Sequence, residues 1–113
     1  MNKSYAFALE AIQLYKFLVA DKKEYVLSKQ FLRSGTAIGA LIKEAEHAQS
    51  KADFLNKMNI ALKEANETEY WLELLRDSRY VSAEIANKLI TDVSTIIKLL
   101  ASIVKTTKLK LNR

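Results

Sequence analysis

The chain has 113 residues, 50% of them hydrophobic and 27% charged, which suits one folded domain and excludes a disordered chain. It has no proline, no cysteine and only two glycines, so disulfides and thiolate metal sites are excluded and a turn-rich β fold is disfavoured. The formal net charge of +5 favours an acidic partner.

The start of the chain enters an amphipathic pattern directly, without the basic, apolar and small-residue order of a signal peptide. The uncharged runs near the start, such as 11–15, are far too short to cross a membrane, and the later segments carry charges every few residues. We therefore expect a cytoplasmic protein with no membrane partner.

The first predicted helix spans about residues 3–20 and carries two apolar stripes at helical spacing. The stripes are Tyr5, Leu9, Ile12 and Val19, and Phe7, Ala11, Leu14 and Leu18. One stripe is enough to pack a helix in a small bundle, so a second stripe indicates contact with another copy. Phe7, Leu14 and Leu18 are therefore predicted interface residues; the alternative is a helix buried on two sides within one chain.

The second predicted helix spans about residues 28–48, with Ser28 as its N-cap. Gly35 and Gly39 lie one turn apart inside it, and each costs roughly 1 kcal/mol relative to alanine. Close approach of a neighbouring helix would explain that cost.

The third predicted helix spans residues 51–77, with Ser50 as N-cap and Asp53 in the first turn. Near its end, Tyr70 and Trp71 extend the apolar surface beyond one stripe, so they are predicted to lie at an interface between copies. The alternatives are burial in the core or, for Tyr70, Trp71 and Tyr80, stacking on bases.

The fourth predicted helix spans about residues 82–105, capped by Ser82, and a basic tail follows over 105–113. This segment is rich in β-branched residues, so a strand is the alternative. Apolar residues spaced three and four apart over six turns nevertheless indicate a helix. Long helices with short connections predict an all-α, antiparallel up-down-up-down four-helix bundle, formed by residues 1–113 as a single domain.

Three blocks of the sequence resemble the bacterial four helix bundle protein family: 30–40 (QFLRSGTAIGA), 49–54 (QSKADF) and 60–72 (IALKEANETEYWL). Its first members are encoded within intervening sequences of large-subunit ribosomal RNA genes, and members assemble as homopentamers. A related branch, the accessory variability determinant of diversity-generating retroelements, works with a reverse transcriptase and nucleic acid. The chain departs from the family pattern at Ala37, Leu41 and Ala45, where serine, asparagine and often glycine are usual.

The candidate catalytic and metal groups favour structural roles. Glu44 and His47 have the spacing of di-iron ligand pairs, but such sites need a second pair and the chain has one histidine. Glu64 and Glu67 lie three apart, and Arg33 is their expected partner in a structural ion pair. If that pair is buried, breaking it would cost roughly 3–5 kcal/mol. We expect no enzyme activity, no cofactor, no metal and no small-molecule substrate.

The positive charge is concentrated near the end of the chain. Residues 82–113 carry six basic and two acidic groups, whereas residues 49–81 carry five and six. The predicted nucleic-acid contacts are Lys105, Lys108, Lys110 and Arg113, with a second patch at Lys22, Lys23 and Lys29.

No sequence-reading motif accompanies these cations, so phosphate contacts of low specificity are expected. A homopentamer that assists a nucleic-acid enzyme such as a reverse transcriptase is the favoured function. The alternative is an oligomeric scaffold that binds another protein, with charge serving only solubility. The alternative for the basic tail is a solvated and frayed end of the chain that binds nothing.

Overall fold

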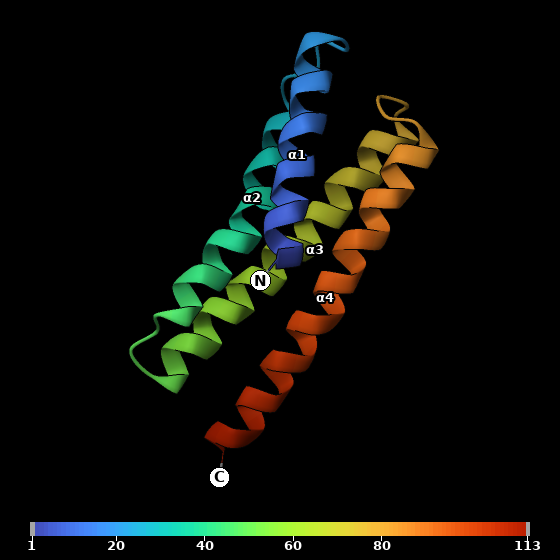
Figure 1. The fold of residues 1–113 in the computed structure, drawn as a ribbon. Helices are drawn as coiled ribbons and strands as arrows, with labels where there is room; N and C mark the ends of the chain where they lie inside the picture. The colour runs from blue at the N-terminus through green and yellow to red at the C-terminus, as the bar shows by residue number, and fades with distance from the viewer. Residues whose placement is uncertain (1, 113) are drawn as a thin grey trace.

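The computed structural model describes residues 2–112, and describes side chains from Lys3 onward. Within that range the chain forms four helices and no strand: α1 (Asn2–Ala20), α2 (Leu27–Glu46), α3 (Lys51–Asp77) and α4 (Ala83–Leu111). Successive helices run in opposite directions (Figure 1). The predicted all-α four-helix bundle is confirmed.

Two of the predicted helix caps are confirmed. The Ser50 Oγ accepts a hydrogen bond from the Asp53 amide at 3.0 Å, and the Ser82 Oγ accepts one from the Ile85 amide at 3.2 Å. Each hydroxyl satisfies one of the amides that a helix start leaves without a partner. These local signals place the starts of α3 and α4.

The predicted cap at Ser28 is wrong. Ser28 lies inside α2, fully buried, and its hydroxyl donates to the Glu24 carbonyl at 2.7 Å. The Glu24 carboxylate instead accepts from the amides of Val26 (3.1 Å), Leu27 (3.1 Å) and Ser28 (2.7 Å). Burial alone would raise the pKa of Glu24, but these bonds favour the charged carboxylate and together hold its pKa below the usual 4.5.

The predicted end of the fourth helix is also wrong, because α4 continues to Leu111 instead of fraying after Lys105. The Thr107 hydroxyl donates to the Ile103 carbonyl at 2.7 Å, and the Asn112 amide donates to the Lys108 carbonyl at 3.1 Å. Lysines in the last turn also complement the negative end of the helix dipole. The basic segment is therefore helical through residue 111.

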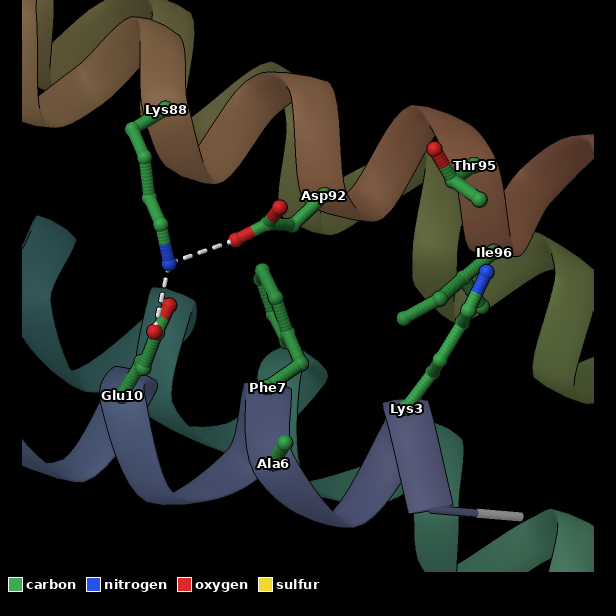
Figure 2. A pocket seen from close by; sticks show the side chains of 8 residues that line it. All are labelled: Lys3, Ala6, Phe7, Glu10, Lys88, Asp92, Thr95 and Ile96. Atoms are coloured by element: carbon green, nitrogen blue, oxygen red, sulfur yellow. Dashed lines mark hydrogen bonds and ion pairs between the residues drawn. The ribbon is translucent and has the colours of Figure 1, made fainter.

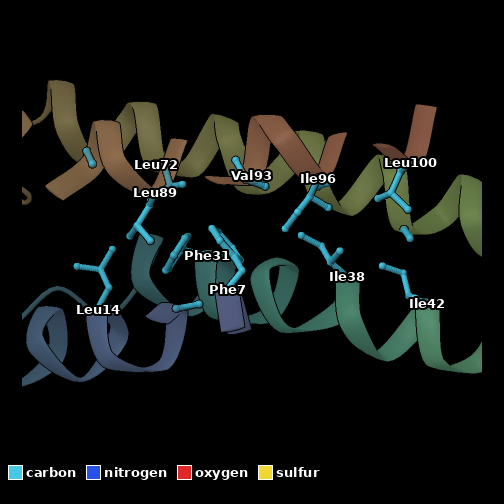
Figure 3. Close-up of a cluster of buried hydrophobic side chains, with 14 of the residues drawn as sticks. Phe7, Leu14, Phe31, Ile38, Ile42, Leu72, Leu89, Val93, Ile96 and Leu100 are labelled. Atoms are coloured by element: carbon cyan, nitrogen blue, oxygen red, sulfur yellow. The ribbon is translucent and has the colours of Figure 1, made fainter. Parts of the chain in front are cut away.

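The core runs along the bundle axis and takes large apolar side chains from all four helices (Figure 3). Its fully buried members include Leu18, Phe31, Ile38, Leu72, Leu75, Val93 and Leu100. Small residues bring α1 close to α2, as the glycine pair predicts. A Cβ at Gly35 would lie 3.2 Å from the Ala11 Cβ, and one at Gly39 would lie 3.5 Å from the Ser4 Oγ.

The four helices do not pack equally. α2 packs extensively on α3, α3 on α4 and α1 on α2, whereas α1 meets α4 only lightly. The molecule is elongated, with extents of 51 × 22 × 21 Å. α1 is the shortest helix, and its first residues lie part-way along the bundle rather than at its tip (Figure 1). The seam between α1 and α4 is consequently the loosest side of the bundle.

Candidate nucleic-acid interface

The last turns of α4 present the strongest basic segment that the structure describes. Lys105, Lys108 and Lys110 are exposed, and none of them forms an ion pair with another described residue. Lys105 and Lys108 are spaced for one side of the helix, and Lys110 lies on another. The fourth predicted contact, Arg113, lies outside the described residues.

Charge is distributed unevenly along the bundle axis. Contacts between helices show which segments lie at the same level along the bundle axis. Gly39 lies beside Ser4, Arg33 beside Glu64, and Lys88 beside Glu10. These levels divide the chain into two ends. The basic end comprises residues 3–7, 38–63 and 94–111 and carries nine lysines and three carboxylates. The acidic end comprises residues 8–37 and 64–93 and carries eight cations and ten carboxylates. One end of the molecule therefore holds all of the positive surplus, and the other end is net negative.

The predicted second patch does not join the first. Lys22 and Lys23 lie in the turn between α1 and α2, and Lys29 lies in the first turn of α2. All three are exposed, at the end of the bundle opposite to the C-terminal end of α4 (Figure 1). Because the two patches lie at opposite ends, one chain cannot combine them into one continuous surface.

Sequence reasoning missed a third group of cations. The turn between α3 and α4 brings Arg76 and Arg79 to a hollow that Lys22 and Tyr80 also line. Lys22 is separated from Arg76 and Arg79 by more than 50 positions along the chain, and the segment between the predicted helices 51–77 and 82–105 carries no binding motif. Only the antiparallel arrangement, which puts both turns at one end, brings them together.

The Arg33 guanidinium lies against both predicted carboxylates. Its Nη1 is 3.1 Å from Glu64 Oε2, and its Nη2 is 3.2 Å from Glu67 Oε1. The hydrogen bond with Glu64 is the main cause that raises the pKa of Arg33. The Arg33 side chain is nevertheless 50% exposed, so the cost of 3–5 kcal/mol expected for a buried pair is too large.

Three of the predicted interface residues are buried inside the single chain. Phe7, Leu14 and Leu18 are 2%, 7% and 0% exposed, so they offer no surface to another copy and that prediction is wrong. Their stripe faces inward because Gly35 admits Ala11 and Phe7 at close range. The other stripe faces outward instead, with Tyr5 68% exposed and Leu9 49% exposed.

Tyr70 and Trp71 remain at the surface of α3. Tyr70 is exposed and Trp71 is half-buried, and their rings meet edge to face with centroids 5.2 Å apart. The indole nitrogen of Trp71 is buried and has no hydrogen-bond partner among the described residues. This pair keeps an apolar surface available to another molecule.

A mainly apolar groove of about 700 Å³ follows the loose seam between α1 and α4. Leu9, Phe17 and Ile85 line it and are 49%, 38% and 49% exposed, while Glu10 and Glu84 supply carboxylates.

Next to this groove lies a smaller polar pocket of about 270 Å³ (Figure 2). There Lys88 of α4 bridges Glu10 of α1 and Asp92, whose Oδ2 is 2.9 Å away. The hydrogen bonds with Asp92 and then Glu10 raise the pKa of Lys88. Lys88 therefore ties the two helices together where their apolar contact is thin.

No cluster of three or more His, Cys, Asp or Glu that could hold a metal occurs between residues 2 and 112. Glu44 and His47 are both exposed near the end of α2, and Glu44 pairs with Lys57 at 3.6 Å. None of the described helices has the length and apolar content that a membrane crossing requires.

Comparison with known proteins gives one decisive match. The family model described as "23S rRNA-intervening sequence protein" matches residues 1–102, which is most of the chain. The chain belongs to the 23S rRNA-intervening sequence protein family. The predicted resemblance is thereby confirmed. Among curated proteins, no relative is found.

A solved structure of the same kind supports the family assignment. It is a protein of unknown function from the S23 ribosomal protein family of Bacteroides thetaiotaomicron VPI-5482, 60% identical to this chain. The match has a TM-score of 0.91 and covers 92% of this chain and 96% of that chain. Neither the family description nor that of the solved structure names a catalytic activity. Lys105, Lys108 and Lys110 lie beyond the residues that the 23S rRNA-intervening sequence protein model matches.

Proposed function

We propose that this protein is a non-enzymatic homo-oligomer that binds nucleic acid through phosphate contacts at its basic end. The observation that carries the proposal is the charge of that end, nine lysines against three carboxylates, with the last turns of α4 held as an exposed helix. A local surplus of this kind attracts a polyanion even though the net charge of the chain is only +5.

The mechanism is displacement of counterions from phosphates by lysine side chains. It needs no base contacts, so affinity should fall steeply with salt and vary little with sequence. Repetition of the basic end in an oligomer would multiply the contacts and raise the avidity. A nucleic-acid enzyme such as a reverse transcriptase is the proposed protein partner, by analogy with the retroelement branch of the resemblance.

The proposed assembly is a pentamer, and the number five rests on the resemblance alone. A ring needs two different patches on each chain, because its contacts are head-to-tail. The chain offers two candidates: the α1–α4 groove around Leu9, Phe17 and Ile85, and the Tyr70–Trp71 pair on α3. These surfaces replace the inward-facing stripe of α1 as the proposed interface.

The alternative is a scaffold that binds another protein and has no nucleic-acid role. The apolar character of the α1–α4 groove favours it, because such grooves accept amphipathic helices. The two functions differ in one measurable property, since only the first requires a salt-sensitive complex with DNA or RNA.

The deciding experiment compares two triple variants that remove equal charge from opposite ends. Binding of the intact protein to unrelated DNA and RNA fragments is measured as salt is varied. K105Q/K108Q/K110Q should weaken binding about equally for all sequences, whereas K22Q/K23Q/K29Q should have the smaller effect. No complex at low salt, or equal effects of the two variants, would contradict binding at the basic end.

Light scattering coupled to size exclusion tests the pentamer, and a monomer mass at micromolar concentration would reject it.

A further inference from the structure

The hollow at the acidic end of the bundle has a lining unlike its surroundings. It measures about 440 Å³ and lies where the turn between α1 and α2 meets the turn between α3 and α4. Its wall carries three cations, Lys22, Arg76 and Arg79, and two aromatic rings, Phe17 and Tyr80, with no carboxylate. In an end where carboxylates outnumber cations, this is a local concentration of positive charge.

Two of the three cations are available to a ligand. Arg76 is held by Asp77, at 2.8 Å from its Nε, and by Asn87, at 2.9 Å from its Nη1. Lys22 and Arg79 form no ion pair with any described residue, and the Lys22 Nζ lies 5.9 Å from the centroid of the Phe17 ring. The hollow therefore has an ordered guanidinium, two unneutralised charges and exposed ring surface.

The backbone at Arg79 is unusual for a residue with a side chain. Its φ is 69°, in the left-handed region, and it completes a helix-ending motif in which glycine is usual. The Tyr80 amide donates to the Leu75 carbonyl and the Arg79 amide to the Arg76 carbonyl, both at 3.0 Å. An arginine at this helix end places its guanidinium on the wall of the hollow, at a position that glycine could also occupy.

We propose that this hollow binds one unpaired nucleotide, with its phosphate at Arg79 and Lys22 and its base against Tyr80. Guanidinium matches phosphate bidentately, and bases stack on aromatic side chains without strong sequence preference. The volume falls within the range of about 300–1,000 Å³ typical of small-ligand sites. This inference goes beyond the proposed function, because the hollow lies between the turns at the start of α2 and the start of α4, whereas Lys105, Lys108 and Lys110 lie in the last turns of α4.

The first test titrates the full chain with AMP, adenosine and inorganic phosphate at low salt, followed by calorimetry or by NMR shifts. AMP should bind at least about ten-fold more tightly than either fragment, equivalent to about 1.4 kcal/mol. If inorganic phosphate binds as tightly as AMP, the proposed stacking of the base is overturned. If adenosine binds as tightly as AMP, the proposed phosphate contact is overturned. No saturation by AMP at about 10 mM would overturn the proposal as a whole.

The second test uses a matched pair of variants, R79G and K23G. Lys23 also has a left-handed backbone, with φ 54°, and lies at the same end but does not line the hollow. Both variants remove one charge and relieve the same backbone strain, so neither should unfold the protein. R79G should weaken AMP binding at least about ten-fold while K23G changes it by less than about two-fold. Equal losses would show that general charge, not the hollow, attracts the ligand.

Two further experiments test the contact with the Tyr80 ring and whether the ligand is a free nucleotide or part of a strand. Y80L keeps an apolar side chain but removes the ring, so it should weaken AMP and leave phosphate unchanged; equal loss of both would overturn the stacking. A 5′-phosphorylated single-stranded tetranucleotide that competes with AMP and binds more tightly identifies a strand as the ligand. Affinity equal to that of AMP identifies a free nucleotide.

The two proposals can fail separately. K105Q/K108Q/K110Q should leave AMP affinity unchanged, and R79G should leave the salt dependence of duplex binding unchanged. Loss of AMP binding in the triple variant would contradict a separate site in the hollow.

Discussion

The hydroxyl oxygens of Ser34 on α2 and Thr68 on α3 lie 2.9 Å apart in the centre of the bundle, and both side chains are fully buried. The Thr68 oxygen also lies 2.8 Å from the Glu64 carbonyl, whereas Ser34 has only a longer contact of 3.3 Å with the Phe31 carbonyl. This polar pair therefore links two helices whose other buried contacts are mainly apolar.

Removing both hydroxyls should cost less than the sum of removing each one alone. T68V should lower the free energy of unfolding by about 1–3 kcal/mol, because it leaves the buried Ser34 hydroxyl poorly satisfied. In the double variant S34A/T68V no such hydroxyl remains, so its loss should be smaller than the sum of the single losses. Denaturant unfolding of the four proteins measures this coupling. Strictly additive losses would show that the two hydroxyls act independently.

Glu24 should make the stability of the protein depend on acidity. Its pKa is lower in the folded chain than its usual 4.5, so its contribution is complete above about pH 4.5 and is lost as the pH falls through the folded pKa. E24Q should therefore be less stable than the parent by about 0.5–2 kcal/mol at pH 7, the typical value of a helix cap. Denaturant unfolding across pH 3–7 should show this difference shrinking as acidity rises. A difference that does not change with pH would contradict the role of the charged carboxylate.

Arg33 should contribute a modest, salt-sensitive stabilisation. Because its side chain is half exposed, R33A should cost about 1 kcal/mol. K57A is the matched control, since Lys57 pairs only with Glu44 at 3.6 Å and its loss should stay within about 0.5 kcal/mol. Thermal unfolding at low and high salt checks both values. A loss above about 3 kcal/mol for R33A would indicate that the pair behaves as a buried one.

The two glycines of α2 should respond differently to alanine. A Cβ at Gly39 would meet Ser4 at ordinary contact distances from 3.5 Å, so G39A should gain up to about 1 kcal/mol from helix propensity. A Cβ at Gly35 would lie 3.2 Å from the Ala11 Cβ, which is held close to the α1 backbone, so G35A must push α1 away and should destabilise. Melting temperatures of the two variants give the comparison. Stabilisation by G35A would show that α1 can move outward without cost.

The sequence by itself determined the elements of this protein. Apolar spacing of three and four residues, together with the lack of turn residues, is a local property that predicts four helices without knowledge of their packing. The caps at Ser50 and Ser82 were predictable for the same reason, since each acts on an amide three residues away. The Arg33 partners were also accessible, because complementary charges on helices joined by a short turn have few other places to meet.

Only the tertiary structure decided which surfaces face inward. Both stripes of α1 have helical spacing, and the choice between them depended on Gly35, which belongs to another helix and admits Ala11 and Phe7. The hollow beside Arg79 likewise required the turn between α1 and α2 and the turn between α3 and α4 to meet at one end of the bundle. Contacts between distant segments of the chain determine these features, because the spacing of residues within a helix gives its periodicity but not the direction in which each face points.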